Sequence, residues 1–155
     1  MSKPVGPSSS GSAPPHPVSY TDYSAPGYTA KVPTGGGWAA PAQSEPTPGR
    51  LYRTSIRGPN GLFAIIDYTP NDKAMFGNYP YESRTEVNQP AIGSATRYVF
   101  TGGKLAGCVQ SPCVDYIMND AASGHGFGVA AGGGDFATAA AVAKTIAESL
   151  TPSGG

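Results

Sequence analysis

Residues 62–68 read Leu-Phe-Ala-Ile-Ile-Asp-Tyr, which places apolar side chains on both faces of an extended chain. A strand of this kind needs cover on two sides, so it belongs inside a sheet and not at its edge. The sequence before it, Gly58-Pro59-Asn60-Gly61, predicts a turn, because Pro59 fixes φ at the first central position and Gly61 accepts a positive φ. Residues 51–57 and 62–68 are therefore predicted to form a hairpin whose second strand is central.

The strongest helix signal lies at the end of the chain. Asp135 is a suitable N-cap, and Thr151-Pro152 stops the helix. Between them one narrow apolar stripe, small enough to lie close against a sheet, recurs at helical spacing. It consists of Phe136, Ala139, Ala140, Ala143, Ile146, Ala147 and Leu150. A short helix over residues 71–76 is also predicted, capped by Asn71-Asp72.

Further strand signals occur at residues 28–33, 96–100, 104–109, 114–118 and 127–131. Together the elements predict an α+β fold, an α/β/α sandwich with a mainly antiparallel sheet of six or seven strands. The C-terminal helix is expected on one face of that sheet. Residues 1–26 are rich in Pro, Ser and Gly, which predicts a linker or tail before a single globular domain at residues 27–152.

Charge and hydropathy exclude some partners. The formal net charge is zero and 13% of residues are charged, so electrostatics gives no reason to expect nucleic acid or an anionic membrane surface. No apolar run approaches the ~20 residues of a membrane span, so this segment is not expected to insert into a membrane.

Two cysteines, Cys108 and Cys113, flank a Ser111-Pro112 turn and are the only ones in the chain. Their closeness favours a disulfide, which needs an oxidising compartment and predicts an extracytoplasmic location. Export would require a targeting or anchoring segment before Ser2. Free thiols, or a metal site shared with His125 and Asp115, remain alternatives, although the spacing differs from that of CxxC motifs.

The sequence contains few residues that suggest a catalytic or ligand-binding motif. There is no GxSxG, P-loop or HExxH pattern, and His125 is the only histidine in the predicted domain. A small secreted enzyme with a cleft near His125, oriented by Asp115 or Asp120, is therefore a minor alternative. We assign no catalytic residue, cofactor or metal from the sequence, and we expect a non-enzymatic domain.

Two glycine-rich patterns have plainer interpretations. Gly126, Gly128 and Ala131 fit GxGxxA, but they lie inside a predicted strand, which favours close backbone packing over a dinucleotide site. Residues 132–134 precede a helix start, where backbone N–H groups can bind an anion, although a loop that ends in an N-cap is favoured.

Aromatic and charged residues define a candidate binding surface, because Tyr, Trp and Arg often anchor interfaces. Its members are Trp38, Tyr68, Phe76, Tyr79, Tyr81 and Arg84. Core or loop packing would explain them equally well. Asp67 follows a buried run, so it should pair with Arg53, Arg57 or Arg97 from a neighbouring strand.

The order of elements resembles that of PsbP/Mog1-like domains. The resemblance covers residues 28–151, including the opening from Tyr28 to Trp38, the run 114–119, then 126–129, and Asp135-Phe136 leading into an alanine-rich helix. In actinobacteria such domains occur in secreted lipoproteins and in the extracytoplasmic C-terminal parts of membrane serine/threonine kinases.

The resemblance implies an extracytoplasmic, non-catalytic binding or sensor module, for example the outer domain of such a kinase. The alternative is a structural or ligand-binding domain of a lipoprotein. The partner would be a protein or a small cell-envelope ligand, and no functional residue is carried over from the family. The cysteine pair is not a defining feature of that family.

Overall fold

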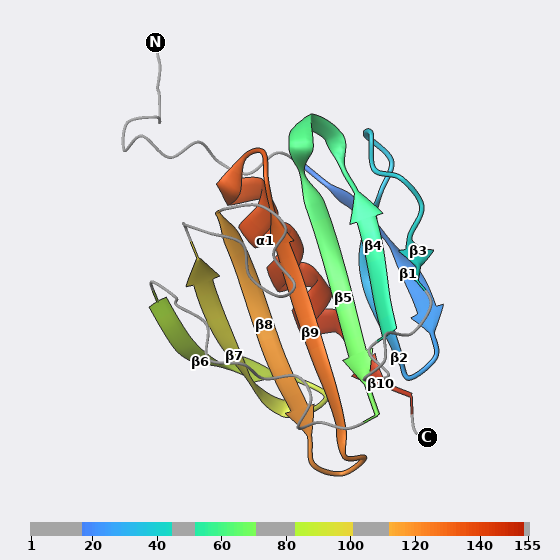
Figure 1. The fold of residues 1–155 in the computed structure, drawn as a ribbon, viewed down its shortest axis with the longest axis vertical. Coiled ribbons are helices and arrows are strands. Elements are labelled where there is room, and N and C mark those ends of the chain that lie inside the picture. The colour runs from blue at the N-terminus through green and yellow to red at the C-terminus, as the bar shows by residue number, and fades with distance from the viewer. Residues whose placement is uncertain (1–16, 45–51, 71–82, 101–111, 154–155) are drawn as a thin grey trace.

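The chain folds into two sheets and one α-helix in the part that the computed structural model describes, residues 17–44, 52–70, 83–100 and 112–153 (Figure 1). No helix in these ranges is long and apolar enough to cross a bilayer. The elements are β1 (Ser19–Ala25), β2 (Tyr28–Thr34), β3 (Ala42–Gln43), β4 (Tyr52–Arg57), a 3₁₀ turn (Pro59–Gly61), β5 (Phe63–Thr69), β6 (Ser83–Gln89), β7 (Gly93–Phe100), β8 (Cys113–Asp120), β9 (His125–Gly132), α1 (Phe136–Ser149) and β10 (Thr151–Pro152).

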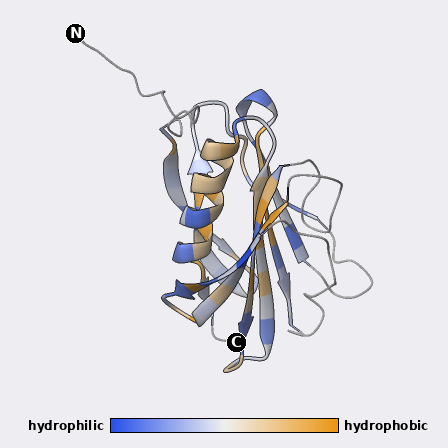
Figure 2. Ribbon diagram, turned by 90° about the vertical axis from the view of Figure 1, so that its left-hand side faces the viewer, coloured by the Kyte–Doolittle hydropathy of each residue, from blue (hydrophilic) through white to orange (hydrophobic). Residues whose placement is uncertain are grey.

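The larger sheet has seven antiparallel strands in the order β3-β4-β5-β9-β8-β7-β6. The smaller sheet has the order β1-β2-β10, with both outer strands antiparallel to β2. In the side view of Figure 2, α1 forms a separate layer on one face of the large sheet. The helix packs on β8 and β9 and also contacts β2, so helix and small sheet share that layer.

The predicted α/β/α sandwich is wrong. The described residues form a mostly β protein with two sheets and a single α-helix, and a second sheet lies beside that helix. Residues 19–25 were predicted to lie in the linker, but they form β1. This strand pairs with β2 along its whole length and half-buries Tyr20 and Tyr23. The predicted helix at residues 71–76 and the strand at 104–109 lie outside the described residues.

The central hairpin and the C-terminal helix are confirmed. β4 pairs with β5, and β5 has β9 on its other side. Asp135 caps α1 as expected, since its carboxylate accepts hydrogen bonds from Ala137 N at 3.2 Å and Thr138 Oγ1 at 2.6 Å. The side chains that α1 buries are Thr138, Ala139, Val142, Ala143, Ile146 and Ala147.

Gln89 joins the end of α1 to the turn between β6 and β7. Its side chain is 1% exposed, and Nε2 donates to the carbonyl oxygens of Ala147 at 2.9 Å and Leu150 at 2.8 Å. Its Oε1 accepts from the backbone N–H groups of Ala91 at 2.8 Å and Ile92 at 2.7 Å. One buried amide thus satisfies helix-terminal carbonyls, which lack intrahelical partners, and fixes a turn 58 residues earlier in the chain.

Substitution Gln89→Leu should lower the free energy of unfolding by about 3 kcal/mol, because it leaves buried carbonyl and N–H groups without this partner. Urea unfolding followed by the fluorescence of Trp38 would measure the loss. Asn88→Leu, at the exposed neighbouring position, is the matched control and should change stability by less than about 0.5 kcal/mol. Equal losses in both variants would contradict the role given to Gln89.

Candidate functional site

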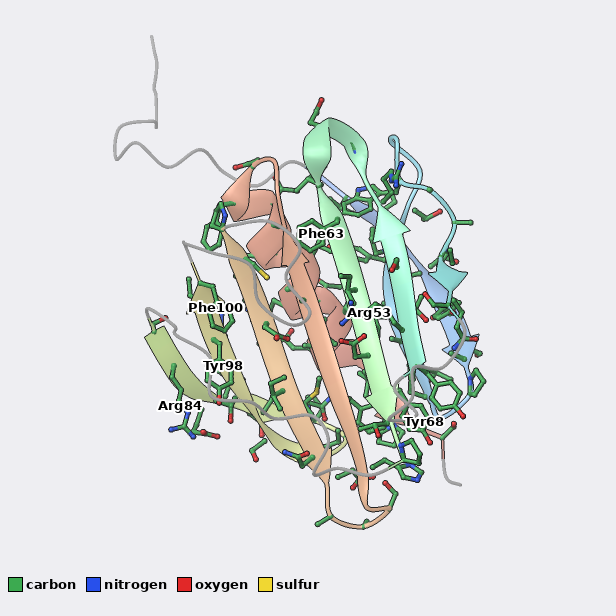
Figure 3. The ribbon with its side chains drawn as sticks, viewed as in Figure 1. Arg53, Phe63, Tyr68, Arg84, Tyr98 and Phe100 are labelled. Atoms are coloured by element: carbon green, nitrogen blue, oxygen red, sulfur yellow. The ribbon has the colours of Figure 1, made fainter. Side chains whose placement is uncertain are left out.

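The large sheet has a second face that points away from α1, which we call the distal face. Side chains alternate along a strand, so Ile66 faces the helix layer while Ile65 and Asp67 lie on the distal face. A second apolar cluster gathers there from four strands. It consists of Ile65, Phe100, Cys113 and Ala130, with Phe63 and Tyr98 packed against it. Phe63, Tyr98 and Phe100 are labelled in Figure 3.

Arg53 and Asp67 form a bidentate ion pair on the distal face. They stand opposite each other on β4 and β5, and the Nε–Oδ1 and Nη2–Oδ2 distances are 2.8 and 2.9 Å. The predicted pairing of Asp67 is therefore confirmed with Arg53. Arg57 lies opposite Phe63 at the other end of β4, and Arg97 hydrogen-bonds Tyr116 instead. The fork geometry holds both side chains in one orientation.

Asp115 is a second buried carboxyl on the distal face. It lies on β8 opposite Ala130 of β9. Strand β9 separates it from Asp67 on β5, and the β9 residues opposite these two carboxyls, Ala130 and Gly128, are small. Burial, reinforced by the charge of Asp67, raises the pKa of Asp115 well above its usual range, and Arg53 opposes this shift. We call Arg53, Asp67 and Asp115 the acid centre. Perturbed carboxyls of this kind are found at functional sites and also in structural networks.

Asp115→Asn should stabilise the protein progressively relative to wild type as pH rises from about 4. A folded-state pKa raised above the unfolded value means that ionising Asp115 costs folding free energy, up to about 1.4 kcal/mol per pH unit until the folded pKa is passed. Urea unfolding between acidic and weakly alkaline pH measures the difference. Ser94→Ala, at an exposed position without an ionisable side chain, is the control, and its difference from wild type should not change with pH. A flat profile for Asp115→Asn would contradict the raised pKa.

His125 and Asp115 are not brought together. Asp115 belongs to the distal face, whereas His125 opens β9 opposite Asp120 and lies against Tyr68, with Nδ1 and Oη 3.5 Å apart. Asp120 accepts hydrogen bonds from Ala122 N and Ser123 Oγ in the β8–β9 turn. The alternative metal site and the alternative cleft need His125 and Asp115 side by side, and this arrangement separates them. Within the described ranges no three metal-binding side chains meet.

The candidate binding surface is dispersed. Trp38 is half-buried against Gly58, where an added Cβ would lie 2.7 Å from its ring. Tyr68 is 8% exposed and stacks on Phe127, while Arg84 lies exposed on β6 across the sheet (Figure 3). Phe76, Tyr79 and Tyr81 lie outside the described residues. The three described members therefore do not form one surface.

The glycine-rich patterns are structural. Gly126, Gly128 and Ala131 all lie within β9, so they do not form the strand-to-helix turn of a dinucleotide site. A Cβ at Gly132 would lie 2.5 Å from the carbonyl oxygen of Pro112, which explains the need for glycine at the end of this strand. After residues 132–134, Asp135 supplies the N-cap of α1, as the plainer interpretation predicted.

Cys113 begins β8 and is completely buried. The part of the chain that the structure describes contains no free cysteine. Cys108 lies outside that part, so its pairing with Cys113 stays a prediction.

A small cleft lies between the flank of α1 and the strands β6 and β7. Its volume is about 50 Å³. Val87, Ala95 and Ala147 supply apolar lining, and Tyr116 is 4% exposed. The full lining is Val87, Asn88, Gln89, Ala95, Tyr116, Lys144, Ala147 and Glu148. The cleft is not predictable from the sequence, because these residues come from four separate elements and share no local pattern.

Charges of both signs stand at the rim of the cleft. Lys144 and Glu148 lie one helical turn apart, with Nζ and Oε2 separated by 3.9 Å and side chains 64% and 53% exposed. Burial raises the pKa of Tyr116, and its hydrogen bond with Arg97 opposes the increase. The cleft therefore combines an apolar lining with a phenol and an ion pair, a combination that can hold one apolar group and orient its polar neighbours.

No family model, curated protein or solved structure matches this chain.

Proposed function

We propose that this chain is a non-catalytic binding or sensor module that works outside the cytoplasm and recognises a partner protein. The observation that carries the proposal is the cleft beside α1, where Val87, Ala95 and Ala147 provide an apolar lining. Its rim is formed by Lys144 and Glu148, which remain accessible to a partner. Concave apolar sites with a few polar groups are the usual places of binding.

The size of the cleft favours a protein partner over a small ligand. Sites for drug-sized molecules enclose about 300–1,000 Å³, whereas this cleft measures about 50 Å³. That volume suits a single side chain, inserted as an anchor from a larger surface. The mixed charge at Lys144 and Glu148 suits a partner with polar or charged residues next to that anchor.

The expected location comes from the sequence. The Cys108 and Cys113 pair favours an oxidising compartment, and the Pro-, Ser- and Gly-rich start of the chain suits a tether. With the resemblance to PsbP/Mog1-like domains, these features support the outer domain of a membrane serine/threonine kinase. The domain of a secreted lipoprotein is the second context that the same features fit.

Filling the cleft should weaken peptide binding without unfolding the protein. Ala95→Val adds apolar volume at a cleft position, and filling a cavity is neutral or stabilising when the space exists. A phage-displayed library of linear random peptides, panned on the wild-type chain, should yield peptides that share an apolar residue. Their affinity for Ala95→Val, measured by calorimetry, should fall at least about tenfold, which is about 1.4 kcal/mol.

The matched control is Ser94→Val, at the preceding and exposed position of β7. Successive side chains of a strand point to opposite faces, so this variant adds apolar bulk away from the cleft and should keep wild-type affinity. Peptides that bind Ala95→Val as well as wild type, or a library without enrichment, would refute the cleft as the recognition site.

The cysteine pair should be oxidised in protein recovered from an oxidising compartment. Cys113 is buried, so the sample must be unfolded in the presence of an alkylating agent before analysis. Mass spectrometry should then find Cys108 and Cys113 unalkylated and the chain lighter by two hydrogen atoms. The same sample treated with a reductant is the control and should be alkylated at both positions. Alkylation without reductant would contradict the extracytoplasmic part of the proposal.

A further inference from the structure

Strand β6 is the last strand of the seven-stranded sheet. Among the described residues it pairs with β7 alone, and no other described strand lies along its outer edge. Ser83, Arg84, Thr85, Glu86 and Asn88 are exposed. A sheet edge of this length is a template for adding another strand in antiparallel pairing.

The charges on β6 are arranged symmetrically about Thr85. Arg84 and Glu86 stand two residues apart on the same face, with Nη2 and Oε2 separated by 3.7 Å. Glu86 also accepts a hydrogen bond from Thr96 Oγ1 at 3.0 Å, which holds its carboxylate over the sheet. Their side chains are 52% and 63% exposed, so both charges remain available to another strand.

We propose that β6 is a self-association edge, on which β6 of a second copy of this chain pairs antiparallel with Thr85 on the two-fold axis. In this register Arg84 of each copy stands directly opposite Glu86 of the other, which gives two opposite-charge pairs. Thr85 meets Thr85, another favourable cross-strand pair. The two large sheets become one continuous sheet, and the contact is isologous, as expected for a closed dimer.

Charge also selects this register over its neighbours. Shifting the axis by one residue, to Arg84 or to Glu86, would place two arginines or two glutamates directly opposite each other. Like charges at directly opposite positions destabilise a strand pair. Charges of one sign would be enough to prevent association at this edge. The edge instead carries one positive and one negative side chain, Arg84 and Glu86.

Charge reversal tests the pairing. Sedimentation equilibrium of the full chain should show a mass that rises with concentration from 15.7 kDa toward twice that value. Arg84→Glu and Glu86→Arg should each weaken the dimer by about tenfold or more, because each places like charges opposite each other twice. The double variant Arg84→Glu/Glu86→Arg restores both opposite-charge pairs and should dimerise like wild type.

Mixing the two single variants gives a sharper result. A strand with two acids then meets a strand with two bases, so the mixture should form heterodimers although each variant alone is monomeric at the same concentration. Circular dichroism of every variant checks that the fold is retained. A wild-type chain that stays monomeric at all concentrations, single variants that dimerise unchanged, or a mixture without heterodimers would each overturn the proposal.

The register is tested by crosslinking. Residues on the axis have Cβ atoms about 5 Å apart, so Thr85→Cys should form a disulfide-linked dimer under mild oxidation. Val87→Cys lies opposite Ser83 in this register and should not link to itself. Wild type, which keeps Cys108 and Cys113, controls for linking through the native sulfurs. Linking at position 87 but not at 85 would overturn the register.

Discussion

The arrangement of the molecule depends on the packing of the alanine-rich flank of α1 against β8 and β9. Ala139, Ala143 and Ala147 are buried there, and their small side chains let the helix axis approach the sheet closely. The space left on the same face, over β4 and β5, is filled from β2, where Tyr28 reaches across to Thr54 with a 3.1 Å contact between hydroxyl oxygens. A bulkier helix would compete with β2 for this face. The helix flank toward β6 and β7 is where the cleft forms.

The two faces of the large sheet carry different kinds of interaction. The face toward α1 is apolar and close-packed, with aromatic contacts such as Tyr28 on Phe127. The distal face holds the acid centre beside a smaller apolar cluster, and the burial of Asp115 opposes the stability that apolar contacts provide. Removing a single partner of the Arg53–Asp67 pair would leave an uncompensated charge, which costs more than the pair contributes. The Arg53–Asp67 pair therefore favours the register in which β4 and β5 place these two side chains opposite each other.

The amino-acid sequence predicts well the elements whose signals are local. Pro59 and Gly61 define the central turn, Asp135 and Pro152 bound the helix, and the apolar run before Asp67 identifies a central strand. The sequence fails where pairing partners decide the structure. β1 is polar and proline-flanked, so it resembles a tail until its register with β2 is known, and β6, with the sequence SRTEVNQ, carries almost no apolar signal.

The residues of the candidate sites follow the same division. The sequence limits the partner of Asp67 to Arg53, Arg57 or Arg97, and the register of β4 on β5 then selects Arg53. The cleft requires knowing that Ala95 and Ala147 come together, which depends on the path of α1 across the sheet. The sequence suggests Asp115 as a neighbour of His125. The alternation of side chains along each strand does not show on which face of the sheet two distant strands place them. The dispersed positions of Trp38, Tyr68 and Arg84 have the same cause.

The small sheet has a mechanical consequence. β1 and β10 flank β2 and are both antiparallel to it, so the first and last strands run parallel to each other. Tension applied along β1 and β10 would load their hydrogen bonds with β2 in shear, across seven residue pairs for β1 but only two for β10. A domain pulled from its ends would therefore yield first where β10 leaves β2, while the longer pairing of β1 with β2 still holds.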